Sequence, residues 1–222
     1  GVLKFSQTFA IPVFLFLGII NLDLASVFNW QLLLTFYIGA ISCFAVGVMA
    51  SILIFKSSRA EAIAIGFCIL FSNAVFLGLP ITELAYGSDA LGANFAIISV
   101  NAPICYLIGI TVMEIFGDEK NSFPNTIQNI FKTITSNTIT MSLLLGLAFN
   151  LLSVPMFLPI STTLSLISPG AIPIALFGLG GILARYKVTK KFNKIFLIVI
   201  LSICIHPLIT ILIGISGFNL SQ

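Results

Sequence analysis

An amide side chain and a proline share one apolar stretch in the first half of the chain. The stretch runs from Phe71 to Glu83, with Asn73 seven residues before Pro80 and Gly78 between them. Proline donates no backbone hydrogen bond, and its ring clashes with the carbonyl four residues earlier. Within a membrane, backbone groups freed in this way must find partners in the protein or in a water-lined cavity. On a helix broken at Pro80, Asn73 is expected two turns earlier on the same face, where its amide can donate and accept.

Two interpretations of this stretch stay open. In the first, the broken helix with Asn73, Gly78 and Pro80 forms part of a binding site for a small ligand. In the second, it is a kinked helix whose Asn bonds a neighbouring helix, as is common in membrane proteins. Asn101, followed by Pro103, repeats the Asn–Pro combination. We therefore add Asn101 to the candidate binding residues, with packing as its alternative.

Other polar residues in apolar stretches carry weaker signals. His206, followed by Pro207, is the only histidine, and a lone histidine is more typical of packing than of a metal ligand or a proton relay. Glu83 lies near the end of its stretch, where a gate is the alternative to simple solvation. The four cysteines form no CxxC pair and fit apolar packing, so we expect no disulfide, metal or cofactor.

Residue types missing from the apolar stretches exclude some kinds of chemistry. No Asp lies inside a predicted span, which argues against an intramembrane aspartyl protease and an Asp-dependent sodium/proton antiporter. No Lys or Arg lies at membrane depth, so helix N-termini and amides would have to meet the charge of a bound anion. We expect no enzyme, and the basic residues form no domain that would bind nucleic acid.

The composition is that of an all-α integral membrane protein. Of 222 residues, 59% are apolar and 8% are charged, and the mean hydropathy is +1.16. In a typical soluble domain, about a quarter of all residues are charged. A helix needs about 20 apolar residues to cross a bilayer. Seven stretches qualify: residues 5–22, 31–55, 61–86, 92–116, 137–154, 159–184 and 192–217.

The positions of the charges predict the orientation of the spans. All ten Lys and Arg lie before the first span or around the loops after the second, fourth and sixth, with Lys194 at the very start of the seventh span, whereas Asp23 and Asp89 lie in the alternate loops. Lys and Arg collect on the cytoplasmic side of membrane proteins. We therefore expect a cytoplasmic N-terminus, an external C-terminus and a cytoplasmic linker over residues 117–136. Because the chain begins with Gly rather than Met, we expect that residue 1 is not the natural start.

Two short segments indicate an internal repeat. Residues 10–16 and 171–177 are identical at five of seven positions, including Pro12 and Pro173. They belong to spans one and six, an odd offset, so the two copies would cross the membrane in opposite directions. Inverted repeats are typical of secondary transporters. A five-span unit used twice predicts ten spans, three more than the seven found.

The chain resembles the auxin efflux carrier family, which includes malonate-transporter-like members. The segment from Phe71 to Pro80 is the most specific part of the similarity, supported by the Pro12 region, residues 171–180 and His206–Pro207. The resemblance implies ten helices in two inverted five-helix repeats, with helices 4 and 9 broken and crossing at the midplane. Residues 1–116 would then hold helices 2–5, and residues 137–222 helices 6–8. Helix 9, with half of the substrate site, would lie outside this chain.

The resemblance also implies a function. The family exports or exchanges small organic anions across the cell membrane by an elevator-like motion, here driven by a proton or ion gradient. Asn73 and Pro80 would lie on the substrate side, and Pro12 and Pro173 would be structural. A bile-acid/sodium symporter from a related inverted-repeat family and a membrane receptor or scaffold without transport stay open as alternatives. The substrate, the coupling ion, the direction of transport and a homodimer also stay open.

Overall fold

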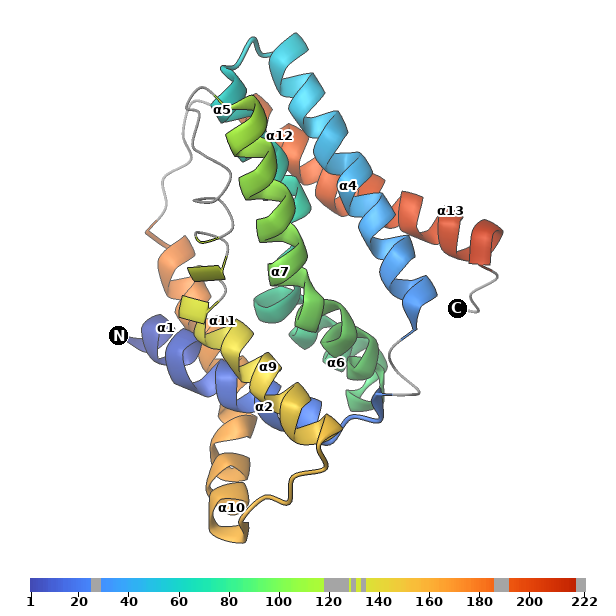
Figure 1. Ribbon diagram of the computed structural model, residues 1–222. Coiled ribbons are helices and arrows are strands. Elements are labelled where there is room, and N and C mark those ends of the chain that lie inside the picture. Colours follow the sequence, from blue (N-terminus) through green and yellow to red (C-terminus); the bar gives the residue numbers. More distant parts are fainter. Residues whose placement is uncertain (25–28, 118–127, 129–130, 133–134, 186–191, 219–222) are drawn as a thin grey trace. The chain divides into compact units, whose positions relative to one another are not determined.

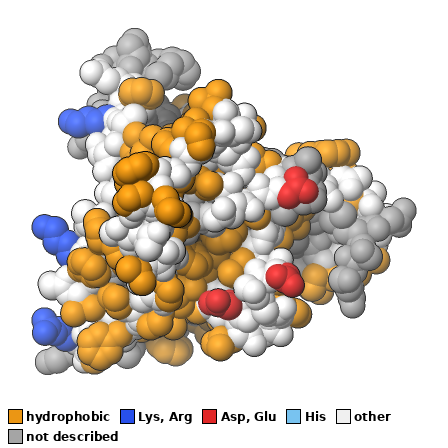
Figure 2. Space-filling view, turned by 90° about the horizontal axis from the view of Figure 1, so that it is seen from below, with side chains coloured by type: hydrophobic (Ala, Val, Ile, Leu, Met, Phe, Trp, Pro, Cys, Tyr) orange, Lys and Arg blue, Asp and Glu red, His pale blue; other side chains and the backbone are white. Residues whose placement is uncertain are grey.

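The computed structural model contains helices and no strand among the residues it describes (Figure 1). These are all residues except 25–28, 118–127, 129–130, 133–134, 186–191 and 219–222. Hydrophobic side chains cover much of the face in Figure 2, as expected for contact with lipid. The all-helical membrane fold predicted from the sequence is confirmed. The helices long and apolar enough to cross a membrane are Val2–Ile20, Trp30–Leu53, Arg59–Tyr86, Ser88–Phe116, Leu158–Leu183 and Phe192–Phe218.

The predicted span 137–154 is shorter than expected. It forms α9 (Thr138–Leu151), an apolar helix of 14 residues. At a rise of 1.5 Å per residue this is about 21 Å, less than the roughly 30 Å of a bilayer core. Asn137 begins the helix by accepting from the backbone N–H groups of Ile139 and Thr140 at 3.0 and 3.3 Å. The described residues thus hold six long spans rather than seven. Most of the predicted linker 117–136 lies outside the described residues.

The chain divides into two compact units. Unit 1 holds residues 1–28, 73–100 and 131–187, and unit 2 holds residues 29–72, 101–130 and 188–222. The chain passes from unit 2 to unit 1 between Ser72 and Asn73, and returns between Val100 and Asn101. Both crossings therefore fall inside predicted spans, directly at the two candidate asparagines.

Unit 1 packs the first span against α9 and α11 (Ala171–Leu183). The first span consists of α1 (Val2–Phe5), the π-helix η1 (Ser6–Ala10) and α2 (Ile11–Ile20), and α11 follows α10 (Leu158–Ile167) and η4 (Ser168–Gly170). In Figure 1, α9 lies alongside α2. The buried core of the unit consists of Ala10, Ile11, Leu15, Ile19, Leu79, Leu91, Phe95, Ile98, Leu143, Ala171 and Ala175.

The two segments of the predicted repeat run antiparallel within unit 1. A Cβ on Gly178, late in α11, would lie 3.0 Å from the Cα of Leu3 at the start of the first span, whereas α2 contacts η4 and α10. In contrast, α9 runs parallel to α2, because its first residues lie beside Pro12 and its Asn150 donates to the Ile20 carbonyl at 2.9 Å. These directions agree with alternating passes of spans one, five and six. The inverted repeat itself stays a prediction.

The described residues of unit 2 form four packed segments. They are α4 (Trp30–Leu53), α5 (Arg59–Leu70), the second part of α7 (Leu91–Phe116), and the run of α12 (Phe192–Val199), η5 (Ile200–Ile205) and α13 (His206–Phe218). Lys194 on α12 lies 2.9 Å from a Glu61 carboxylate oxygen and donates to Ser57 Oγ at 2.8 Å. This pair fastens α12 to the beginning of α5.

In the part of the chain that the structure describes, three π-helical segments each end two residues before a proline. They are η1, η2 (Ala74–Gly78) and η5, which precede Pro12, Pro80 and Pro207. Proline lacks an N–H and crowds the carbonyl four residues earlier. A wider turn relieves that crowding, so the helix continues past the ring.

Candidate functional site

The third span is interrupted before Asn73, not at Pro80 as predicted. α5 ends at Leu70, residues 71–73 are not helical, and the helix resumes with η2 and α6 (Leu79–Tyr86). Asn73 has φ −81° and ψ 59°, outside the helical region. Pro80 is the second residue of α6, and η2 widens the preceding turn. The helix therefore accommodates Pro80, and Asn73 lies at a helix end rather than on the face of a continuous helix.

Asn73 is the N-cap of the second half of the span. Its Oδ1 accepts from the Phe76 N–H at 3.2 Å, and its backbone carbonyl accepts from Leu77 and Gly78 at 3.3 and 3.1 Å. Asn is among the strongest N-cap residues, which explains why the helix restarts here. The cap uses Oδ1, so Nδ2 of this exposed side chain is left as a donor. A helix N-terminus also carries partial positive charge, so this end of η2 favours an anion.

Gly78 has space around it. A Cβ there would meet only Ala74 Cβ and the Asn73 carbonyl oxygen, both at 3.7 Å, which is ordinary contact within its own segment. Within the described part of the chain, no second segment comes that near. The structure thus assigns Gly78 no packing role that requires glycine.

Pro80 lines a hollow of about 360 Å³ in unit 1. Glu83 follows Pro80 by one helical turn and is the charged residue of the lining. Phe14 and Pro173 come from the two segments of the predicted repeat, so the hollow joins both segments to the broken span. Its volume lies in the range of small-molecule sites. The lining consists of Phe14, Pro80, Glu83, Leu84, Ser168, Pro169, Ile172, Pro173 and Leu176.

Asn101 lies in unit 2, in a buried polar cluster. It is 5% exposed, and α7 continues past it through Pro103. Its Oδ1 accepts from Tyr37 Oη at 3.4 Å and from Cys105 Sγ at 3.4 Å. Cys105 Sγ also lies 3.8 Å from the carbonyl oxygen of Leu70, the last residue of α5. These partners favour the packing alternative for Asn101. Because Asn73 belongs to unit 1, neither unit contains both predicted asparagines.

Sequence reasoning did not identify the hydrogen-bond partners of Asn101. Cys105 follows Asn101 by four residues, a spacing that puts both on one helix face and offers a signal. Tyr37 lies on another span, and no local pattern pairs it with Asn101.

In unit 1, Asn94 Nδ2 donates to Thr82 Oγ1 at 2.7 Å and ties α7 to α6. This bond holds the second half of the broken span in place.

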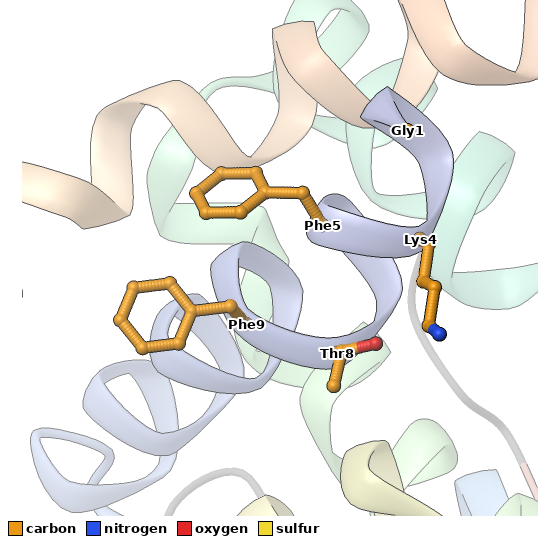
Figure 3. Close-up of a pocket in the computed structure, with 5 residues that line it drawn as sticks. All are labelled: Gly1, Lys4, Phe5, Thr8 and Phe9. Carbon is orange, nitrogen blue, oxygen red and sulfur yellow. The ribbon is translucent and has the colours of Figure 1, made fainter.

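A second hollow, at the start of the first span, is a weaker candidate. Figure 3 shows Phe5 and Phe9 on one side of the helix, and Lys4 and Thr8 directed elsewhere. The two phenyl rings lie 5.6 Å apart. Since the polar groups do not converge with the rings on one point, this surface lacks the arrangement of a small-molecule site.

The comparison with protein families decides the class. The model of the family described as "Membrane transport protein" matches residues 1–219, almost the entire chain. The chain belongs to this family. It is the auxin efflux carrier and malonate-transporter-like family, so the resemblance seen in the sequence is confirmed. Its members are transporters rather than enzymes, and this transport protein passes the membrane several times. No curated protein matches the chain.

Proposed function

We propose that this transport protein is a secondary active carrier that exports or exchanges small organic anions such as carboxylates. The observation that carries the proposal is the interruption at residues 71–73. It lies at the middle of the 28-residue span Arg59–Tyr86 and leaves a helix N-terminus and an exposed Asn73 amide in an apolar segment. Interrupted helices of this kind bind anionic groups at their N-termini in secondary transporters.

The donors available to a carboxylate are neutral. The sequence contains no Lys or Arg between residues 60 and 119. The first N–H groups of a helix have no intrahelical acceptor, so Ala74 and Val75 can donate beside Asn73 Nδ2. Hydrogen bonds to a charged group are worth about 1.5–3 kcal/mol each. Two or three such bonds would hold a carboxylate without a buried cation.

For alternating access, we propose that the two units move against each other in an elevator-like motion. The chain crosses between them at the non-helical residues that precede Asn73 and again before Asn101. Hinges are commonly a few loop or element-terminal residues. Asn73, Pro80 and the hollow all belong to unit 1, so in this proposal they would move together.

The charges within each unit support a cell-membrane protein with a cytoplasmic N-terminus. In unit 2, Lys194 on α12 is paired with Glu61 near the beginning of α5, the helix whose first residue is Arg59. In unit 1, α1, which carries Lys4, contacts α11, which ends just before Arg185. The cations named here, Lys194 in unit 2 and Lys4 and Arg185 in unit 1, thus lie at one end of their unit, as the positive-inside rule predicts.

Single-cysteine labelling tests this orientation. In a cysteine-free background, Lys56→Cys is expected to resist an impermeant thiol reagent in intact cells, whereas Asp89→Cys is expected to react. Labelling at position 56 with none at position 89 would reverse the assignment.

Uptake by proteoliposomes tests the proposed function. We expect saturable uptake of at least one labelled mono- or dicarboxylate, competed by the unlabelled acid and not by its neutral amide. The control is a liposome without protein. If no member of the panel is taken up, exchanged or able to raise the melting temperature of the protein, the carboxylate proposal is wrong.

A further inference from the structure

We propose that His206 binds the coupling proton of the carrier, at its Nδ1 atom, between α4 and α13 of unit 2. The inference rests on the proposed function and names its coupling ion. It comes from the place of the only histidine of the chain, which begins α13 directly after the π-helix η5 and is 8% exposed. An ionisable residue inside a membrane span is costly, and its presence marks a functional site by default.

The hydrogen bond of the ring assigns the nitrogen that titrates. His206 Nε2 lies 3.1 Å from the carbonyl oxygen of Phe36 on α4. A carbonyl oxygen only accepts, so Nε2 carries a hydrogen in the neutral ring. Nδ1 then holds the free electron pair. The coupling step is the binding of one proton to this pair and its release, with no other bond formed or broken.

The neighbouring helix is shaped around the ring. A Cβ on Gly39 would lie 2.8 Å from His206 Cδ2 and 2.8 Å from Thr210 Oγ1, so only glycine leaves this space. The Phe36 ring meets the imidazole edge to face, with centroids 4.8 Å apart. Thr210 Oγ1 donates to the His206 carbonyl oxygen at 2.9 Å, within the helix that follows Pro207. The ring itself is fixed in position and orientation by Phe36 and Gly39 of α4, whereas the Thr210 bond is local to the backbone of α13.

Among the residues that the structure describes, no carboxylate is paired with the imidazole. Lys194 and Glu61 bond each other on α12 and α5, and Tyr37 Oη donates to Asn101. Among the described residues, the titratable or charged groups on elements packed against His206 are Tyr37 and Cys43 on α4, Arg59, Glu61 and Cys68 on α5, Lys194 on α12 and Cys204 on η5.

Because no described carboxylate balances the charge of a protonated His206, binding of a proton changes which state of the carrier is favoured. A positive imidazole between apolar helices is costly, so the protonated carrier favours a state in which the ring gains water or an anion. The neutral ring favours the packed arrangement seen here. Histidine changes its charge between about pH 5 and 8, the range in which cells maintain proton gradients.

Two transport assays on the same proteoliposomes separate coupling from transport. Counterflow of a labelled carboxylate at equal pH on both sides measures exchange, and accumulation under an imposed pH gradient measures coupling. We expect the wild type to show both. His206→Gln keeps an amide N–H that can donate to the Phe36 carbonyl, but its side chain has no atom that binds a proton at physiological pH. It is expected to retain counterflow within about twofold and to lose accumulation above the level without a gradient.

Two further variants keep the test independent of folding. Gly39→Ala retains the histidine but displaces its ring, so we expect accumulation with a shifted pH midpoint. Thr210→Val removes a local bond and leaves Nδ1 unchanged, so it is the matched control and is expected to couple normally. If His206→Gln does not fold, Gly39→Ala decides, and an unchanged pH midpoint overturns the proposal.

The outcomes distinguish this inference from the proposed function. Wild-type counterflow without a response to the pH gradient would overturn the role of His206 and leave the carrier proposal intact. The same holds if His206→Gln accumulates substrate as the wild type does. Absence of wild-type counterflow for every carboxylate would refute both.

Discussion

Replacement of Asn73 separates its two roles, since its two amide atoms serve different purposes. Oδ1 caps the helix through the Phe76 N–H at 3.2 Å, and Nδ2 is the proposed donor to substrate. Asn73→Ala removes both, so we expect a loss of about 1 kcal/mol in the free energy of unfolding. We also expect a loss of roughly tenfold to a hundredfold in substrate affinity, the equivalent of about 1.5–3 kcal/mol.

Asn73→Asp distinguishes the cap from the ligand contact. Aspartate is as strong an N-cap as asparagine, and its charge suits the positive helix end. The variant should therefore be as stable as the wild type. It has no N–H donor and repels a carboxylate, so its substrate affinity should fall at least as far as that of Asn73→Ala.

Thermal unfolding with and without substrate measures both effects. Asn137 is the matched control, because it caps α9 through the same kind of bond, to Ile139 at 3.0 Å, outside the broken span. Asn137→Asp should leave the stabilisation by substrate unchanged. If substrate stabilises Asn73→Asp as much as the wild type, Asn73 does not bind it and serves only as a cap.

Three further substitutions test the structure around this site. Gly78→Ala should leave the melting temperature and transport unchanged, because the nearest atoms to its new methyl group lie at 3.7 Å, and lost transport would reveal a contact at Gly78 that this geometry does not explain. Gly146→Val should lower the melting temperature, because its Cβ would lie 3.0 Å from the Phe16 carbonyl oxygen, and an unchanged value would refute the close packing of α9 on α2. Asn150→Leu should cost about 1 kcal/mol in unfolding free energy with substrate affinity unchanged, because Nδ2 donates to three carbonyl oxygens at the end of α2. Chemical denaturation measures this cost, and equal stability of Asn150→Leu and the wild type would show that the Asn150 hydrogen bonds do not stabilise the protein.

The long spans could be predicted from the sequence because bilayer thickness sets a minimum apolar length. The second span was predicted at 31–55 and forms α4 over Trp30–Leu53. The length of α9 could not be read from hydropathy, because the apolar stretch runs to residue 154 whereas the helix ends at Leu151. Ser153 has a positive φ of 51°, which no helix adopts, and hydropathy carries no information on such a backbone turn.

The interruption of the third span was predicted in part, and the binding role of its residues stays a prediction. Asn73 does mark the interruption, but the interruption arises from its capping preference and not from the missing N–H of Pro80. The widened turn of η2 is a cooperative response of the helix, which residue-by-residue propensity does not contain. The bond from Tyr37 to Asn101 joins residues 64 positions apart, and only tertiary packing brings them together.

Counterflow of a labelled dicarboxylate through wild type and Asn73→Asp tests the central claim most directly. The assay reports binding and translocation without any assumption about the driving ion. We predict saturable exchange by the wild type, and at least a tenfold higher half-saturating concentration for Asn73→Asp at equal amounts of folded protein. Equal half-saturating concentrations for the two proteins would contradict the claim that the interrupted span binds the carboxylate.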